Sequence, residues 1–338
     1  MQALHKKWAA VFLLIASSTT MWAQAPSRYF RTGQAADRTT QPQAGFALMG
    51  GGNDLDDAFR FLCRRAQGGD FLVLRAAGDD EYNRYIQKLC PLNSVATIIL
   101  PTRAAAEDPL VADKIREAGG IFIAGGDQAN YINFWMGTPV QTALNEAIRR
   151  GVPIGGTSAG LAVLGEYAYT AQGDKPDDPN LDGKTALADP FGPRITLARG
   201  FLDIPILKGV ITDTHFAKRN RMGRLLTFLA RLNVPDGRPS SSSGPVRGIG
   251  VQERTAVLLE SDGRATVVGK CCAYFIDANT AQGTVEKGKP LAFGPLAVQK
   301  VAPGHSFNIK EWRGDATGYT LKVEAGTIHS TQPDGAIY

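Results

Sequence analysis

Gly156-Thr157-Ser158-Ala159-Gly160 lies between the apolar run Val152-Pro153-Ile154 and the small apolar run Leu161-Ala162-Val163-Leu164. The first run predicts a strand and the second a helix, so the serine would stand at the apex of a strand–turn–helix segment, as in a nucleophile elbow. In so tight a turn the residues two before and two after the serine need almost no side chain, and both are glycine. A serine oxygen exposed at such an apex is open to a neighbouring base, which indicates acyl-transfer chemistry. The spacing alone is a weak signal, and a glycine-rich loop after a strand is the alternative.

Four strand-and-helix pairs precede this turn and predict the fold class. Short apolar runs give the strands, at Phe46–Met49, Phe71–Arg75, Val95–Leu100 and Ile121–Ala124. Helical stretches follow them, at Asn53–Ala66, Glu81–Leu89, Asp108–Ala118 and Ala129–Arg150. This alternation predicts an α/β fold with a mostly parallel sheet sandwiched by helices. Because ligands of such sheets bind beyond the carboxyl ends of the strands, we expect the loops Gly50–Asn53 and Gly125–Gln128 to converge on Ser158.

The chain changes character after the turn. A strand at Val210–Thr212 and a basic helix at Lys218–Leu232 continue the alternation. From Ile249 onward the chain is strand-rich, and we expect a C-terminal extension that continues the sheet with antiparallel strands. We divide the chain into an export signal at 1–25, a polar linker at 26–44 and a single α/β hydrolytic domain at 45–338.

Residues 1–25 have the composition of an export signal. Lys6 and Lys7 precede the apolar core Trp8–Ala16, and small residues follow near a cleavage site. A membrane anchor needs about 20 apolar residues, so we expect a secreted or periplasmic protein without membrane attachment after signal removal. Loss of the two lysines lowers the formal net charge from +5 to +3, which is too small to favour nucleic acid as a partner.

In an oxidising compartment, the four cysteines could form disulfides. Cys63 and Cys90 can form a bridge there, while Cys271 and Cys272 lie in a strand-like stretch where core and surface positions alternate. The spacings match no metal signature, since there is no CxxC and no neighbouring histidine. We expect neither a metal ion nor a cofactor.

Histidine is scarce, and His215 is the best candidate for the base that serves Ser158. It follows a strand and precedes a helix, which would place it at the same edge of the parallel sheet as the serine. Its imidazole needs an acidic partner, for which Glu253 and Asp213 compete. We favour Glu253, at the end of the strand-like run Gly248–Val251, and expect Asp213 to contact substrate. A histidine that only packs and an exposed strand-end glutamate are the alternatives.

Further segments supply candidates for oxyanion and substrate contacts. Ala159 follows the serine and Gly126 lies at a neighbouring strand end, so their N–H groups predict an oxyanion hole. Gln128, in the same loop as Gly126, can bind a substrate amide. Arg221 and Arg224 are three apart on the expected basic helix, where they would share a face and could clamp carboxylates. A plain strand-to-helix turn and a solvated basic face are the alternatives.

Taken together, these motifs resemble the cyanophycinase family, peptidase family S51. The resemblance covers about residues 45–270 and rests on four linked segments: Gly155–Gly160, Gly125–Gln128, Asp213–Phe216 with the arginines that follow, and Gly248–Gly250 with Glu253. It implies a flavodoxin-like α/β sandwich, related to class I glutamine amidotransferase domains and often dimeric. It also implies a serine exopeptidase that releases β-aspartyl-arginine dipeptides from cyanophycin, a polymer with an aspartate backbone and arginine side chains.

The resemblance also implies roles for individual residues. The family's nucleophile, base and acid fall on Ser158, His215 and Glu253, and its substrate contacts fall on Gln128, Asp213, Thr214, Arg221 and Arg224. The family commonly has glutamine where this chain has Thr214. Threonine is shorter and offers no amide, which indicates a rebuilt substrate subsite.

Two other functions are compatible with the same residues. A peptidase of this family could cleave aspartyl or isoaspartyl dipeptides, and a non-catalytic exported binding protein could use the same scaffold. We expect cyanophycin or β-aspartyl peptides as the partner and a homodimer as the assembly. The export signal suits an enzyme that degrades polymer released by other cells.

Overall fold

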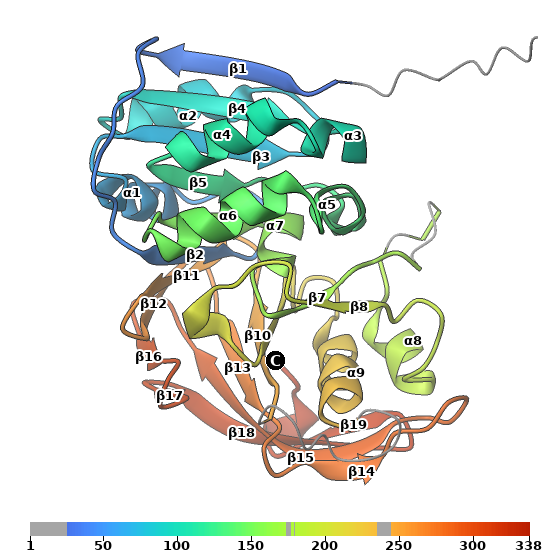
Figure 1. Ribbon diagram of the computed structural model, residues 1–338. Coiled ribbons are helices and arrows are strands. Elements are labelled where there is room, and N and C mark those ends of the chain that lie inside the picture. Colours follow the sequence, from blue (N-terminus) through green and yellow to red (C-terminus); the bar gives the residue numbers. More distant parts are fainter. Residues whose placement is uncertain (1–25, 174–176, 179, 235–244) are drawn as a thin grey trace, which may run out of the picture.

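The computed structural model describes residues 26–173, 177–178, 180–234 and 245–338. The export signal expected at 1–25 lies outside these described residues. Figure 1 shows two halves: the elements up to the Ser158 turn form the upper one, and most of the strand-rich remainder curves beneath it. In the described part of the chain, no helix combines the length and apolar character that a membrane crossing requires.

The upper half alternates strands and helices, as predicted. Its strands are β1 (Arg28–Gly33), β2 (Gly45–Met49), β3 (Asp70–Arg75), β4 (Ser94–Ile99), β5 (Gly120–Ile123) and β6 (Ile154–Thr157). Its helices are α1 (Asp56–Arg65), α2 (Glu81–Leu89), α3 (Arg103–Ala106), α4 (Pro109–Glu117), α5 (Gln128–Trp135), α6 (Pro139–Arg149) and α7 (Ala159–Ala162). Strands β4, β3, β5, β6 and β2 lie side by side in that order and pair in parallel.

Alternating burial explains why helices cover both faces of this parallel sheet. Leu72 and Leu74 of β3 join the core formed with α4 and α6, whereas Phe71 and Val73 pack on the opposite face with α1 and α2. A strand buried on both faces appears in the sequence as a continuous apolar run, which is the pattern that predicted these strands. The helix-sandwiched parallel sheet is therefore present in this half.

Two expectations for the upper half need correction. The supposed linker 26–44 contains β1, which pairs antiparallel with β4 and forms the edge of the sheet. An edge strand is only half buried and carries polar side chains, so its composition resembled that of a linker. The helix expected over residues 129–150 is two helices, because Gly137 adopts a φ of +75° and Pro139 begins α6.

The lower half is dominated by strands. They are β7 (Tyr167–Tyr169), β8 (Leu197–Arg199), β9 (Val210–Asp213), β10 (Arg247–Val251), β11 (Thr255–Glu260), β12 (Arg264–Gly269), β13 (Ala273–Asp277), β14 (Gln282–Thr284), β15 (Ala292–Val301), β16 (Ser306–Asn308), β17 (Arg313–Gly314), β18 (Thr317–Glu324) and β19 (Thr327–Ser330). Helices α8 (Gly183–Ala188) and α9 (Met222–Asn233) pack against each other, and short 3₁₀ turns occur at Pro205–Leu207 and Pro333–Gly335.

Only part of this C-terminal region extends the first sheet. Strands β11, β12, β16 and β17 continue it in antiparallel pairing from β2. The other strands form a second sheet in the order β19-β18-β15-β13-β10-β9-β7-β8, with β14 paired to β15. In this sheet β9 pairs in parallel with β10 and β7. A strand's pattern shows which face is buried and leaves open which distant strand pairs with it, so the sequence did not predict the division.

Cys63 and Cys90, for which the sequence allowed a bridge without deciding the pairing, form a disulfide that joins α1 to the residue after α2. The two cysteines are 27 residues apart, and in the chain-entropy view a loop of that length stabilises the fold by about 3.5 kcal/mol. Cys271 and Cys272 are free thiols, the first half-buried and the second buried. This alternation agrees with the strand start expected there.

Candidate active site

Ser158 occupies a sharp turn between β6 and α7, with a φ of +53° and a ψ of −117°. A non-glycine residue in such a conformation costs about 1–3 kcal/mol. A Cβ at Gly160 would lie 2.0 Å from the carbonyl oxygen of Ile123, and one at Gly156 would lie 2.5 Å from the carbonyl carbon of Gly160. Both glycines are therefore required sterically, as the sequence pattern indicated.

His215 follows β9 and is held against the loop after β2. It has a φ of +48°, and its backbone N–H donates to the carbonyl oxygen of Gly50 at 2.8 Å. A Cβ at Gly51 would lie 2.5 Å from ring atoms Cε1 and Nε2 of His215. The glycine run after β2 therefore lets the imidazole lie directly on the backbone. His215 belongs to the second sheet, so our expectation that it shares a sheet edge with Ser158 is wrong.

The side chains of Ser158, His215 and Glu253 form a continuous hydrogen-bonded series. The distance from Ser158 Oγ to His215 Nε2 is 2.7 Å, and that from His215 Nδ1 to Glu253 Oε1 is 2.6 Å. An ionised carboxylate can only accept, so Nδ1 carries the hydrogen and Nε2 accepts from the serine hydroxyl. In this arrangement the imidazole can take the serine proton while the carboxylate fixes its tautomer.

Both titratable partners of this series have shifted pKa values. Burial lowers the pKa of His215, and the positive charges of Arg219 and Arg221 add to this effect against the opposing hydrogen bond to Glu253. The hydrogen bond from His215 lowers the pKa of Glu253. At neutral pH the imidazole is therefore uncharged and the carboxylate is ionised, which is the state a general base requires.

A cavity of about 210 Å³ opens beside the serine. Its lining comprises Gly126, Asp127, Gln128, Ser158, Ala171, Thr214, Arg219, Arg221 and Arg224. The loop after β5 lies against the serine, since a Cβ at Gly125 would be 3.6 Å from Ser158 Cβ. The loops after β2, β5 and β6 therefore converge, as expected, and the N–H groups of Gly126 and Ala159 are available candidates for an oxyanion hole.

Arg224 of the cavity wall forms a buried ion pair with Asp213 behind it. Arg224 Nε donates to Asp213 Oδ2 at 2.8 Å, and Nη2 donates to Oδ1. Their side chains are 2% and 3% exposed, and Asp213 does not line the cavity. We expected Asp213 to contact substrate, but it holds Arg224 instead, because a buried carboxylate needs a cationic partner.

Arg221 reaches the cavity from just before α9. The helix begins at Met222 with Arg221 as its N-cap residue, later than the expected start at Lys218, yet Arg221 and Arg224 both line the cavity as expected. Arg221 Nη1 donates to the carbonyl oxygen and hydroxyl of Thr214 at 3.0 and 3.1 Å, and Nε and Nη2 donate to Asn180 Oδ1 at 3.0 and 2.9 Å. Burial and the nearby Arg224 lower the pKa of Arg221 to about 9, so it stays cationic at neutral pH.

Sequence reasoning assigned no role to several residues that build this wall. Arg219 is exposed, lines the cavity and acts electrostatically on His215. Asn180 orients Arg221, and Ala171 lines the cavity. Asn180 lies in a segment rich in Asp, Pro and Gly, where no local signal distinguishes it. Only its tertiary contact reveals its role.

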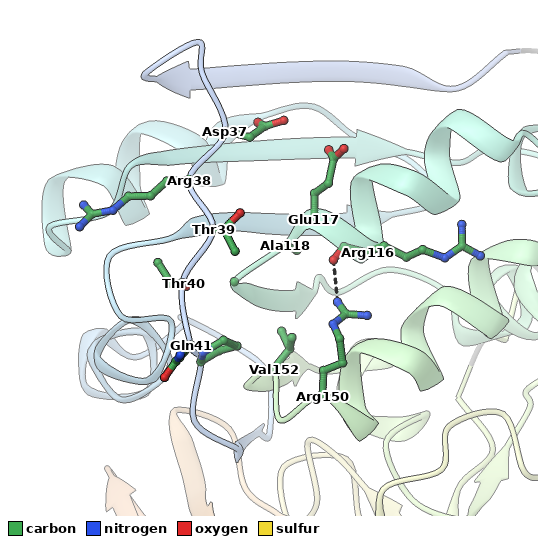
Figure 2. Close-up of a pocket in the computed structure, with 12 residues that line it drawn as sticks. Asp37, Arg38, Thr39, Thr40, Gln41, Arg116, Glu117, Ala118, Arg150 and Val152 are labelled. Carbon is green, nitrogen blue, oxygen red and sulfur yellow. Dashed lines mark hydrogen bonds between the residues drawn. The ribbon is translucent and has the colours of Figure 1, made fainter.

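A second cavity, of about 720 Å³, lies between the segment 37–42 and the ends of α4 and α6 (Figure 2). Arg116 beside it is paired with Glu146 and Asp113, and Arg150 donates to the Arg116 carbonyl oxygen at 2.6 Å. The lining contains no serine, cysteine or histidine. We therefore place the chemistry at the smaller cavity. Among the described residues, no cluster of three or more His, Cys, Asp or Glu side chains is placed to hold a metal ion.

Comparison with known proteins identifies the family. The model described as Peptidase family S51 matches residues 73–231. A cyanophycinase from Geminocystis herdmanii is 32% identical over 214 residues, which cover 62% of this chain and 69% of that protein. The chain belongs to peptidase family S51. This S51 protein is thus a serine-type peptidase, and Glu253 lies beyond the segment that the family model matches.

Further relatives of this S51 peptidase carry the same name. Cyanophycinases from Synechococcus elongatus and Trichormus variabilis are 30% and 31% identical over 224 and 215 residues. The matches cover 65% and 61% of this chain and 62% of each relative. A solved peptidase from an acI-B1 Actinobacterium aligns with a TM-score of 0.49 at 18% identity, over 79% of this chain and 98% of that one.

Proposed function

We propose that this S51 peptidase is an exopeptidase that hydrolyses cyanophycin and releases β-aspartyl-arginine dipeptides. Its relatives named cyanophycinase support the substrate class. The observation that carries the proposal is the hydrogen-bonded series Ser158–His215–Glu253 at the edge of an arginine-lined cavity. A serine with a base is suited to acyl transfer, and the cationic wall is suited to carboxylate-bearing substrates.

The proposed mechanism uses Ser158 at a nucleophile elbow. His215 takes the hydroxyl proton while the serine oxygen attacks the carbonyl carbon of a backbone peptide bond. The amides of Ala159 and Gly126 stabilise the tetrahedral oxyanion. His215 then gives the proton to the leaving amine, which departs and leaves an acyl-enzyme. Water, deprotonated by the same imidazole, attacks this ester and releases the acid product.

The arginine-lined wall is proposed to position the substrate. Arg221 and the exposed Arg219 provide positive charge for its carboxylates, Arg224 lines the same wall with its charge paired to Asp213, and Gln128 of the same cavity binds an amide. Thr214 stands where the family commonly has glutamine, and its hydroxyl accepts from Arg221. In this chain Thr214 thus orients Arg221, and as a shorter side chain than glutamine it extends less far into the cavity.

Product analysis tests the proposal most directly. We expect the wild type to release soluble β-aspartyl-arginine from purified cyanophycin and Ser158→Ala to release none, as measured by mass spectrometry. A wild type without soluble dipeptide product would refute cyanophycin hydrolysis. A fluorophosphonate that labels the wild type and not Ser158→Ala would still establish a serine nucleophile, and so would exclude a non-catalytic binding protein.

Thr214 gives a specific reason to keep a second substrate class. A subsite without the family's glutamine suits shorter ligands, such as aspartyl or isoaspartyl dipeptides. Incubating the enzyme with these dipeptides and with cyanophycin, and comparing kcat/KM, separates the two. A Thr214→Gln variant that gains cyanophycin activity and loses dipeptide activity would favour the dipeptidase as the native function.

We also propose an exported, dimeric enzyme with one α/β domain, which includes the edge strand β1 as well as residues 45–338. The lysines and apolar core within 1–25 support export, and the N-terminus of the protein recovered outside the cytoplasm would test it. Sedimentation at micromolar concentration would test the homodimer. We class the upper half as flavodoxin-like and related to class I glutamine amidotransferase domains. In support, the order β4-β3-β5-β6 follows the flavodoxin sequence 2-1-3-4, with β2 in the fifth place.

A further inference from the structure

Cys271 and Cys272 place two free thiols immediately before β13, close to each other and to the surface. Their sulfur atoms are 3.2 Å apart. Cys271 is half-buried, whereas Cys272 is only 9% exposed. The first thiol is therefore open to a reagent from solvent, and the second is within reach of the first.

The backbone of these cysteines supports the turn that carries Glu253. The N–H of Cys271 donates to Thr255 Oγ1 at 3.1 Å, and that hydroxyl donates to the carbonyl oxygen of Glu253 at 3.2 Å. The N–H of Gln252 donates to the carbonyl oxygen of Cys272 at 3.2 Å. Both flanks of Glu253 are thus hydrogen-bonded to the dithiol segment.

The same turn continues to His215 through tight backbone packing. The N–H of Lys270 donates to the Arg254 carbonyl oxygen at 2.7 Å, and the N–H of Arg254 donates to Gly51 at 2.8 Å. Gly51 lies directly against the imidazole of His215, as shown above. A Cβ at Gly269 would lie 2.3 Å from the Arg254 carbonyl oxygen, so this side of the turn has no spare room.

We propose that Cys271 and Cys272 are a modification site that a small-molecule disulfide oxidises to a vicinal disulfide, and that closure weakens the bond between His215 and Glu253. The thiolate of Cys271 attacks the small disulfide, forms a mixed disulfide and releases one small thiol. The Cys272 sulfur then displaces the second small thiol. Two electrons pass from the protein to the reagent, and the two protein protons end on the released thiols.

The order of attack follows from the surroundings of the two thiols. Burial and the neighbouring thiol raise the pKa of Cys272 to about 11, which keeps it protonated at neutral pH. The more accessible Cys271 therefore attacks first, and Cys272 closes the ring.

Closure must move the backbone because a disulfide needs sulfur atoms about 2.05 Å apart and a fixed dihedral angle. The ring formed includes the peptide bond between the two cysteines. The N–H of Cys271 and the carbonyl oxygen of Cys272 lie on either side of this peptide bond. They are the groups that are hydrogen-bonded to Thr255 and Gln252. Rotation there shifts Glu253 away from His215 Nδ1 and leaves the imidazole without its orienting carboxylate.

The effect on His215 rests on the proposed function, whereas the disulfide does not. The test equilibrates the intact mature protein with oxidised or reduced glutathione. Three quantities are followed: the mass of the peptide containing both cysteines, the low-field NMR resonance of the His215 Nδ1 proton, and the rate of fluorophosphonate labelling at Ser158. We expect oxidation to remove two hydrogens from the peptide, move the resonance and slow labelling at least tenfold, with recovery under reductant.

Single substitutions supply the controls. Cys272→Ser and Cys271→Ser cannot close the ring. With oxidised glutathione we therefore expect the His215 Nδ1 proton resonance of each variant to keep its position and the labelling rate at Ser158 to change less than twofold. Failure of the wild type to form the vicinal disulfide would overturn the site. Complete closure with an unchanged resonance would overturn the coupling. If the reduced protein takes up no phosphonate, the proposed catalytic role of Ser158 fails, while the mass and the resonance still decide the present inference.

Discussion

Ser158 and His215 reach one hydrogen bond from two regions that are built differently. Ser158 follows a strand of the parallel sheet, and its turn is enforced by Gly156 and Gly160, which are two residues away on either side. His215 follows β9 of the second sheet and is held by Gly51 and Glu253, which are distant in sequence. The turn that carries the nucleophile is shaped by its own two glycines, of which Gly156 approaches Gly160 and Gly160 approaches Ile123 of the neighbouring strand β5, whereas the base is placed by tertiary contacts alone. The two regions should therefore respond differently to substitution.

The largest effect is expected from removal of the nucleophile. Ser158→Ala should lower kcat/KM for cyanophycin by roughly 10⁵-fold, because the acyl-enzyme cannot form. The free energy of unfolding should change by less than about 1 kcal/mol, since one neutral hydrogen bond is lost. Product release and thermal unfolding measure the two quantities. Substantial residual turnover in Ser158→Ala would rule out the covalent route.

The next largest effect concerns Glu253, the acidic partner that tertiary contacts bring to His215. Glu253→Gln should lower kcat by about 10³- to 10⁴-fold with little change in KM, because an amide does not stabilise the imidazolium or fix the required tautomer. Glu253→Asp keeps the charge and should retain more activity than the amide variant. Steady-state kinetics on both variants provide the measurement. Equal rates for Glu253→Gln and wild type would show that His215 needs no carboxylate.

A glycine substitution tests whether close backbone approach fixes the serine turn. Gly160→Ala should lower the free energy of unfolding by about 3 kcal/mol or more, because its Cβ would lie 2.0 Å from a backbone oxygen. Gly125→Ala is the matched control on the neighbouring loop, where the nearest atom is 3.6 Å away, and should cost under about 1 kcal/mol. Urea denaturation compares the two variants. Similar losses in both would mean that close approach of α7 to β5 does not depend on glycine.

The smallest effect concerns the electrostatics of the base. His215 has a lowered pKa, so kcat/KM should fall as the pH drops through that lowered value and the imidazole becomes protonated. Arg219→Gln removes a positive charge that disfavours the imidazolium, raises the pKa of His215 and moves this acid limb to higher pH. Arg219→Lys keeps the charge and serves as control. A limb that stays in place, or moves to lower pH, in Arg219→Gln would contradict the electrostatic coupling.

The sequence predicted the upper half well because its elements are marked by contiguous residues. The helix Glu81–Leu89 was predicted with the observed bounds. The edge strand β1 was missed because half-exposed strands lack an apolar run. The second sheet was missed because pairing of β9 with β10 joins segments separated by α9 and the residues after it. For the same reason, the position of Arg221 before the helix and its bond to Asn180 were not foreseeable.

The choice of acidic partner separates the two kinds of information most clearly. Sequence alone determined the serine turn, the need for its two glycines and the candidacy of His215, because each is marked by contiguous residues that predict a strand, a turn and a helix. Tertiary structure decided between the two carboxylates. Asp213 is two residues from His215, yet its charge is buried against Arg224. Glu253 is 38 residues away and still reaches Nδ1, because the order of strands, which no single segment encodes, brings the end of β10 beside the end of β9.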